Sequence, residues 1–385
     1  VTVDGLNIKD SKLVTANSVV EANITNGAVT SGKIASGVVP TLRPNAKPLV
    51  VNSNMAIAQR NSGTVAQSDG SNEGYATVDR MNLVFGNSAG GTITTSRDNT
   101  APTGFGQSMK FDVTSADGSV ASNQIVYMKT TLEAQDIRNS GWNYTSSSSY
   151  LTLSFWVRSS KTGIYCAFLE TLDASYMRSS EYTISSADTW EQKVLTFPGK
   201  TELVFNNDNG AGLNIGFTFA VGTDRDGTNN TWETTNYGTS NQVNFLDSTS
   251  NILYLTGIQL EVGEFSSTNL PPFQHESYGD NLLRCQRYYQ LVQNWSGGVV
   301  NSSTAYINAT FWKTMRTTPS VTTTGALNGN DIANNVNQSS GQVTLHGANE
   351  NGFWGGIGNF SSLTTNNPFN SRFQNTNKLA FSSEL

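Results

Sequence analysis

Cysteine is almost absent from this sequence. Among 385 residues there are only two cysteines, Cys166 and Cys285. They lie far apart, in what we expect to be different structural segments, and so few cysteines exclude a disulfide framework. We expect both to be buried free thiols in a protein made in a reducing cytoplasm, with a single cross-link between them as the alternative.

Long apolar runs and clusters of positive charge are also lacking. No apolar stretch approaches the roughly 20 residues that span a bilayer. The first four residues, Val-Thr-Val-Asp, have neither the basic start nor the apolar core of a signal peptide. The net charge is −6, without a long run of Lys or Arg. These absences exclude membrane insertion and predict no nucleic-acid partner.

Histidine is as scarce as cysteine, with only His275 and His346. Neither has a second His, Cys or carboxylate at a recognised ligand spacing, so a zinc site and a Ser/His triad are poorly supported. The sequence also has no GxSxG motif and no phosphate-binding glycine motif. We therefore expect that the protein is not an enzyme and holds no cofactor.

Acidic side chains are the remaining candidates for chemistry, because paired carboxylates can cleave polysaccharides. They lie among turn-forming residues, where Asp commonly accepts backbone hydrogen bonds. We interpret these as structural: Glu133 with Asp136, Asp224 with Asp226, and Asp208. A structural calcium ion is the alternative, since oxygen ligands recur at 207–209 and 224–226, but the full spacing of a known calcium loop is absent.

Glycine, serine, threonine and asparagine are abundant, and charged residues make up only 14% of the chain. This composition is typical of short strands joined by turns, so we predict an all-β fold. The strands expected between residues 50 and 275 suggest a sandwich. They are Met81–Phe85, Ser108–Val113, Gln124–Lys129, Tyr150–Arg158, Gly163–Leu169, Gln192–Phe197, Leu213–Val221 and Ile252–Leu260.

One of these strands shows the pattern of a half-buried sheet with particular clarity. Apolar residues occupy every second position from Leu151 to Val157, which predicts one face in the core and one face nearer solvent. Trp156 and Trp190 we interpret as core or inter-sheet packing rather than as ligand platforms.

The first 40 residues carry a five-residue repeat. Residues 19–38 read VVEAN, ITNGA, VTSGK, IASGV, with one apolar residue leading each unit. So few apolar side chains cannot order a lone chain, but three chains wound about one axis would share a thin apolar core. We predict a trimeric stalk, with a flexible linker or a monomeric solenoid as alternatives. Its core residues are Leu13, Val19, Ile24, Val29 and Ile34.

Three prolines follow the repeat, at Pro40, Pro44 and Pro48, and predict a stiff connector over residues 41–49. The sandwich is expected over 50–275 and a helical neck over 276–291. Within this neck we predict a helix over Tyr278–Tyr289, packed through Leu282, Cys285 and Tyr289. It is either a neck where protomers meet or an ordinary helix that closes one end of the sandwich.

The last segment, residues 292–385, returns to strands among loops rich in Asn, Ser and Gly and is expected to form a smaller β domain at the tip. Strands are expected at Thr304–Trp312, Ser320–Thr324, Gln342–Leu345 and Lys378–Phe381. Aromatic rings among amides can stack on sugar faces while the amides bind hydroxyls, although core packing suits most of them. The candidate receptor contacts are Trp354, Phe353, Trp295 and Trp312.

Several motifs resemble the tail-fibre and receptor-binding proteins of tailed bacteriophages, especially those of marine and cyanobacterial viruses. The run GAVTSGKIASG at 27–37 is similar to their stalk repeats. GIQLEVG at 257–263 with CQRYYQ at 285–290 is similar to the place where a jelly-roll-like, carbohydrate-module-like sandwich leads into a further domain. FWVRSSKTGIYCAFLE at 155–170, FWKTMRTTPSVT at 311–322 and the closing AFSSEL extend the resemblance over nearly the whole chain.

The resemblance implies a homotrimeric tail fibre of the virion, made in the host cytoplasm. Its partners would be virion proteins at the N-terminal end and a glycan or protein of the host surface at the other. It carries over no sugar-binding residue. The alternatives are a purely structural head fibre, collar fibre or tail adaptor, and a polysaccharide depolymerase.

Overall fold

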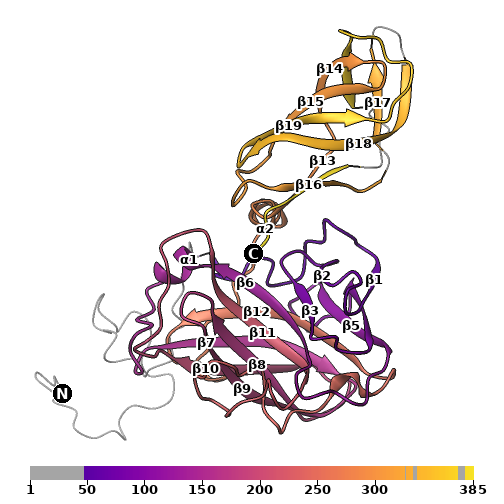
Figure 1. Ribbon diagram of the computed structural model, residues 1–385. Coiled ribbons are helices and arrows are strands. Elements are labelled where there is room, and N and C mark those ends of the chain that lie inside the picture. Colours follow the sequence, from indigo (N-terminus) through magenta and orange to yellow (C-terminus); the bar gives the residue numbers. More distant parts are fainter. Residues whose placement is uncertain (1–46, 326, 333–335, 372–377) are drawn as a thin grey trace, which may run out of the picture.

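Two antiparallel sheets packed face to face form the larger part of the protein in the computed structural model (Figure 1), which describes residues 47–325, 327–332, 336–371 and 378–385. The first, named here the β12 sheet, has the spatial order β1 (Thr64–Gln67), β4 (Thr92–Asp98), β5 (Ser108–Ser115), β12 (Ile252–Val262), β7 (Tyr150–Ser159) and β10 (Glu191–Pro198). The second, the β11 sheet, has the order β2 (Gly74–Tyr75), β3 (Asn82–Gly86), β6 (Ile125–Glu133), β11 (Ala211–Val221), β8 (Gly163–Thr171) and β9 (Tyr176–Ile184).

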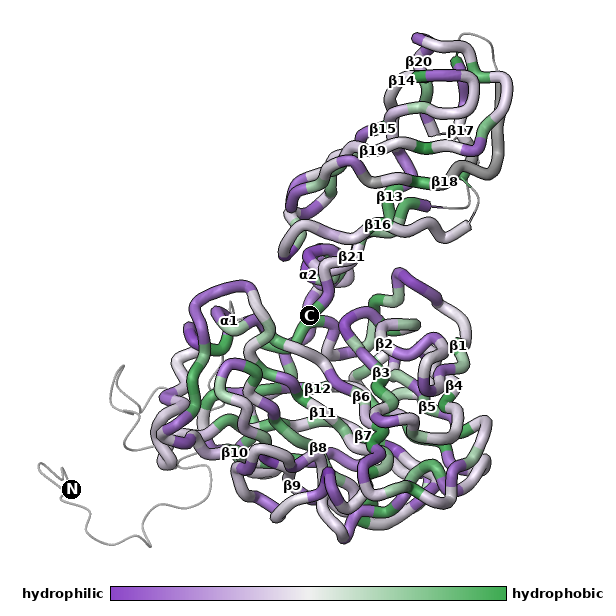
Figure 2. Tube along the Cα trace, in the orientation of Figure 1, coloured by the Kyte–Doolittle hydropathy of each residue, from purple (hydrophilic) through white to green (hydrophobic). Residues whose placement is uncertain are grey.

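The core of the sandwich lies between these sheets and follows from alternation along each strand. On β7, Leu151, Leu153, Phe155 and Val157 are fully buried, as the period of two predicts. Green apolar positions recur along the strands in Figure 2, and hydrophilic positions gather in the connecting loops. The prediction of an all-β fold with a sandwich is confirmed for the described residues.

Trp156 and Trp190 lie outside this core, so their interpretation as core residues is wrong. Both are half-buried, and Trp156 points away from its core-facing neighbours Phe155 and Val157. The reason is the same alternation, because residue 156 has the opposite parity to the buried face.

In the described part of the chain, two short helices accompany the strands, α1 (Ala134–Arg138) and α2 (Tyr278–Cys285), with a 3-10 turn at Phe245–Asp247. Ser277 caps α2, since its Oγ accepts a hydrogen bond from the Asp280 amide at 3.1 Å. The helix ends at Cys285, so the predicted extension to Tyr289 is wrong. Tyr289 instead begins strand β13, whose backbone pairs with the last strand of the chain.

The C-terminal unit consists of a closed barrel and a small sheet that joins it to α2 (Figure 1). The barrel contains β14 (Ser296–Asn301), β15 (Thr304–Thr310), β19 (Gly352–Gly358), β18 (Val336–Asn349), β17 (Leu327–Asp331) and β20 (Pro368–Ser371). The small sheet contains β13 (Tyr289–Val292), β21 (Leu379–Ser382) and β16 (Ser320–Thr323). One core, which includes Phe353, Phe369 and Phe381, serves both parts.

The two units are joined by more than one passage of the chain. After β21 the C-terminal residues return to the sandwich, where Arg60 and Arg80 bind the Glu384 carboxylate and Tyr75 Oη donates to the Leu385 carbonyl at 2.8 Å. The last residues of the chain therefore contact the sandwich, although they follow residue 292 in the sequence. Residues 383–385 belong by packing to the junction.

Several sequence-based expectations concern features outside this architecture. The stalk over 1–40 and its core residues lie outside the described residues. Both cysteines are free and buried, as predicted. No helix in the described ranges has the length and apolar character needed to cross a bilayer.

Candidate binding site

Three aromatic rings form an exposed cluster on the outer wall of the barrel, named here the aromatic platform: Tyr306 of β15, His346 of β18 and Trp354 of β19. The His346 and Trp354 rings are stacked, with centroids 5.0 Å apart and an angle of 25° between planes. Tyr306 meets His346 at 5.1 Å and Trp354 at 6.1 Å. Tyr306 is 45% exposed and Trp354 50% exposed.

Strand alternation determines which residues reach this wall. On β15 the neighbours Ala305 and Ile307 are buried in the barrel, so Tyr306 projects outward. On β19 Phe353 and Ile357 are buried, and Trp354 takes the outward position. The two strands pair directly, which brings the outward side chains of β15 and β19 together.

Glycines let these rings lie close to the sheet. A Cβ atom on Gly347 would come within 2.6 Å of Trp354 Nε1, and one on Gly356 within 3.0 Å of His346 Nε2. The indole and imidazole therefore occupy space that any larger residue at these two positions would fill. The two glycines therefore leave the space in which these rings lie close to the barrel wall.

Polar side chains border the platform. Asn308 pairs in register with Trp354, and Ser296 pairs with Asn308, so amide and hydroxyl groups lie beside the indole. Both side chains are exposed, as is Thr344, which pairs with Gly356. An apolar surface with a border of hydrogen-bonding groups suits a ligand that has an apolar face and a polar rim, such as a pyranose.

The structure divides the four candidate receptor contacts into two groups. Trp354 belongs to the platform, and Trp312 is 69% exposed but makes no ring contact with it among the described residues. Trp295 and Phe353 are only 4% and 5% exposed, so the prediction of receptor contact is wrong for both. Trp295 stacks on Phe369 at 5.6 Å, and Phe353 packs on Phe381 at 4.6 Å, because both face the barrel core.

Two platform residues, Tyr306 and His346, were missed by the sequence interpretation. The alternation of Ala305 and Ile307 with Tyr306 carried a signal for an outward ring. His346 gave none, because a bulge between Leu345 and Gly347 interrupts the alternation on β18.

The neck residues pack within their own chain. Cys285 is buried with Val51, Ile57 and Tyr288, and Leu282 lies against the same cluster. Tyr289 is covered by the Arg60 guanidinium, 3.8 Å above its ring. Helix α2 therefore closes the end of the sandwich that faces the barrel.

Glu133 and Asp136, one of the two carboxylate pairs, line a cleft of about 680 Å³ at this junction. Arg287 binds both carboxylate oxygens of Glu133, at 2.6 and 2.8 Å, and Tyr288 Oη donates to it at 2.7 Å. Burial opposes ionisation, but these hydrogen bonds outweigh it and hold the pKa of Glu133 below its usual range. This carboxylate serves as an anchor between the two units.

Two other acidic candidates make structural hydrogen bonds. Asp208 Oδ1 accepts from the Gly210 amide at 2.9 Å within a turn, and Asp224 Oδ2 accepts from Ser122 Oγ of a distant loop at 2.7 Å. Within the described ranges no group of three or more His, Cys, Asp or Glu side chains is placed to hold a metal ion.

Comparisons with known proteins give no family assignment. No protein-family model matches the sequence, and no curated protein matches it. Similar solved structures include a family 11 carbohydrate-binding module from Clostridium thermocellum in complex with a mixed-linked tetrasaccharide, at 12% identity and a TM-score of 0.28, covering 54% of this chain and 99% of that one.

Another similar structure is the N-terminal cellulose-binding domain of β-1,4-glucanase C from Cellulomonas fimi. It is 12% identical with a TM-score of 0.26 and covers 57% of this chain and 99% of that one. Similarity at these scores assigns no function, so the function has to be argued from the residues of this chain.

Proposed function

We propose that the chain is a homotrimeric tail fibre of a bacteriophage that recognises a host surface by binding glycan through the aromatic platform. The observation that carries glycan binding is the exposed group of Tyr306, His346 and Trp354 on one rigid wall. Rings that are already held in place lose little side-chain entropy when a ligand covers them, so little of the binding free energy is spent on ordering them. The motifs of the stalk and neck favour the fibre.

Binding rather than catalysis fits the acidic groups described above. Glu133 is held by Arg287 and Tyr288 and is 1% exposed, so it is poorly placed to attack a sugar or to activate water. Asp208 accepts a hydrogen bond within a turn, and Asp224 accepts one from Ser122 of a distant loop. These contacts support a non-enzymatic role and weigh against the depolymerase alternative.

The test is to replace Trp354 with alanine in the full chain and measure binding to an array of bacterial lipopolysaccharides and capsular polysaccharides. We expect affinity for the bound glycan to fall at least about tenfold, the loss typical of a central aromatic contact. Folding should survive, because half of this side chain already contacts solvent.

Trp312→Ala is the matched control, since it removes an even more exposed tryptophan that makes no ring contact with the platform among the described residues. It should bind as well as the unchanged chain. Equal losses in both variants, or no loss in Trp354→Ala, would contradict the assignment of the platform. Loss of the circular dichroism spectrum in Trp354→Ala would place that ring in a structural role instead.

A further inference from the structure

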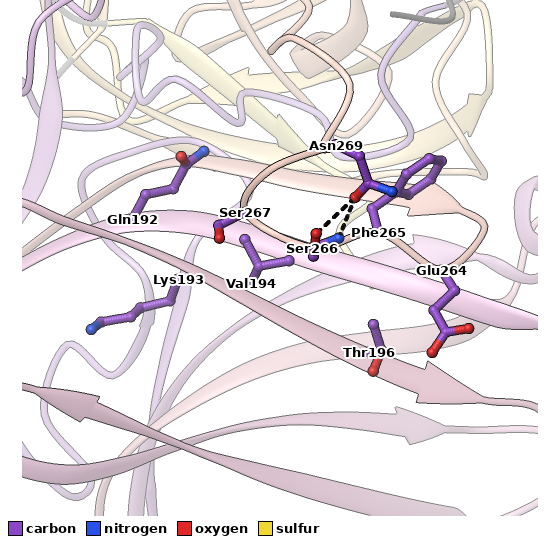
Figure 3. A pocket seen from close by; sticks show the side chains of 9 residues that line it. All are labelled: Gln192, Lys193, Val194, Thr196, Glu264, Phe265, Ser266, Ser267 and Asn269. Carbon is purple, nitrogen blue, oxygen red and sulfur yellow. Dashed lines mark hydrogen bonds between the residues drawn. The ribbon is translucent and has the colours of Figure 1, made fainter. Parts of the chain in front are cut away.

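A second surface with ligand-binding chemistry lies on the sandwich, far along the sequence from the barrel platform. Figure 3 shows a groove between strand β10 and the loop after β12, lined by Gln192, Lys193, Val194, Thr196, Glu264, Phe265, Ser266, Ser267 and Asn269. It is an open surface groove with a volume of about 660 Å³. None of the platform residues lines it.

The walls of the groove are fixed by hydrogen bonds. Thr152 Oγ1 donates to the Gly263 carbonyl at 2.7 Å and accepts from the Phe265 amide at 3.0 Å, which ties the loop to β7. Inside the loop, Asn269 Oδ1 accepts from the Ser266 amide at 2.6 Å (Figure 3). A groove held in this way needs little ordering when a ligand binds, which favours affinity.

Aromatic residues continue from one end of the groove over the outer face of the β12 sheet. Gln192, in the groove wall, pairs in register with Trp156, so their side chains are neighbours on that face. Gly257 has a φ of +65° and carries no side chain, and Phe105 and Trp156 approach the place of its missing Cβ atom to within 2.8 and 3.1 Å. The Trp190 and Tyr254 rings, 6.3 Å apart, lie on the next part of this face.

Charge narrows the class of ligand. The Lys193 ammonium forms an ion pair with Glu191 and donates a hydrogen bond to the Thr183 carbonyl. The exposed Glu264 carboxylate forms no ion pair in the described part of the chain. The groove therefore presents one free carboxylate among amide and hydroxyl groups. It should favour neutral sugars and sugars with a protonated amine and disfavour acidic ones.

We propose that this groove, with Trp156 at its end, binds a neutral or amino-sugar oligosaccharide of at least two rings. One ring stacks near Trp156 beside Gln192. Rings farther along β10 reach Ser267 and then Glu264, which lies at the other end of the groove (Figure 3). This inference goes beyond the proposed function, because it concerns a different unit of the chain and requires neither the platform nor a trimer.

The experiment uses the full chain carrying Trp354→Ala, so that the barrel platform is disabled. Isothermal titration is made with chitin tetrasaccharide, which is neutral, chitosan tetrasaccharide, which carries amines, and a tetrasaccharide of galacturonate, which is acidic. We expect the first two to bind and the third not to bind. Adding Gln192→Ala should weaken both several-fold, the loss of one polar contact at an exposed site.

Glu264→Gln separates the two binding sugars, because it removes the charge and keeps the shape. Chitosan binding should fall about tenfold and chitin binding should change little. Glu73→Gln is the matched control, since Glu73 is also exposed but lies outside the groove, and it should have no effect. Trp156→Phe should remove most of the ligand-dependent change in tryptophan fluorescence.

The outcomes distinguish this inference from the proposed function. If the Trp354→Ala chain binds neither chitin nor chitosan, or binds them equally well with Gln192→Ala, the groove is not a glycan site. If the groove variants abolish all glycan binding and Trp354→Ala alone has no effect, the result supports the groove as a glycan site and contradicts the platform.

Discussion

At the scale of single residues, the platform depends on glycine as much as on its rings. Gly347 leaves room for the Trp354 indole, whose Nε1 would lie 2.6 Å from an added Cβ atom. That distance is too short for any real contact, so one of the two groups would have to move. The exposed ring is the easier group to move, because its far end is free.

Gly347→Ala should therefore displace the Trp354 ring without unfolding the barrel. We expect glycan affinity to fall about tenfold, equal to about 1.4 kcal/mol, while the midpoint of thermal unfolding changes little. Titration and calorimetry on the same sample check the two parts. Gly298→Ala is the control on the same wall, since the atom nearest to its added Cβ would be the Asn367 carbonyl oxygen, at an ordinary 3.8 Å. A similar loss of affinity in this control would contradict the explanation.

The residue scale is also where the sequence was least able to distinguish roles. Phe353 and Trp354 are adjacent aromatic residues in one glycine-rich segment, yet one is buried and the other is half exposed. Composition marks both as candidates. The parity of the strand separates them, and glycine at 352, 355 and 356 removes the side chains that would have revealed that parity.

At the scale of elements, the junction between the sandwich and the C-terminal unit is held by charged groups from separate strands and loops. Glu133, at the end of β6, is bound by Arg287 from the turn after α2. Arg80 is 1% exposed, lies 3.6 Å over the Tyr288 ring and binds Glu384. Buried charges of this kind are costly unless all partners are present, so each one makes the relative position of the units specific.

Glu133→Gln should destabilise the protein by about 2 kcal/mol at neutral pH, because charge-assisted bonds from Arg287 become weaker neutral ones. The sign with pH follows from the lowered pKa of Glu133 in the folded chain. Its contribution is complete above the unfolded pKa, about 4.3, and is lost as the pH falls through the folded value. The two unfolding curves should therefore converge in acid.

Urea unfolding of the unchanged chain and of Glu133→Gln at pH 7 and pH 3 measures whether their free energies of unfolding converge. Gln135→Ala supplies a graded comparison, because Gln135 donates to the same carboxylate and helps to lower its pKa, so its loss of stability should be smaller and should shrink in acid in the same sense. A Glu133→Gln deficit that stays constant down to pH 3 would show that the ionised carboxylate is not the source of the stability.

Helix α2 shows how tertiary contacts override a local pattern. The spacing of Leu282, Cys285 and Tyr289 suits a helix, and the first two residues do lie on one. Tyr289 does not, because its backbone pairs with Ser382 of β21. That partner lies almost a hundred positions away, and a local period contains no information about it.

At the scale of the whole molecule, the proposed trimer rests on the five-residue repeat. Replacing Ile24, Val29 and Ile34 together with serine removes the apolar side chains that the three chains would share. We expect the unchanged chain to sediment as a trimer and this variant as a monomer. Analytical ultracentrifugation at equal concentrations gives the answer, and a monomeric unchanged chain would contradict the stalk.

A trimer would also increase the overall strength of binding that several weak sugar contacts give together. Three platforms on one particle can bind a dense glycan surface with far greater strength than a single platform, without any new contact. The serine variant should therefore lose adsorption to cells while keeping the affinity of one site for a soluble oligosaccharide. Loss of both would indicate that the repeat contributes to the site itself.

The sequence by itself determined the all-β class, the core face of β7, the burial of both cysteines and the presence of a helix before the C-terminal strands. Each follows from composition or from a period within a short segment. Only the tertiary structure decided which aromatic residues face solvent, that Glu133 is an anchor, and that Trp156 lies beside a groove. These depend on which strands become neighbours, and residues from distant segments then share one surface through contacts that no local pattern encodes.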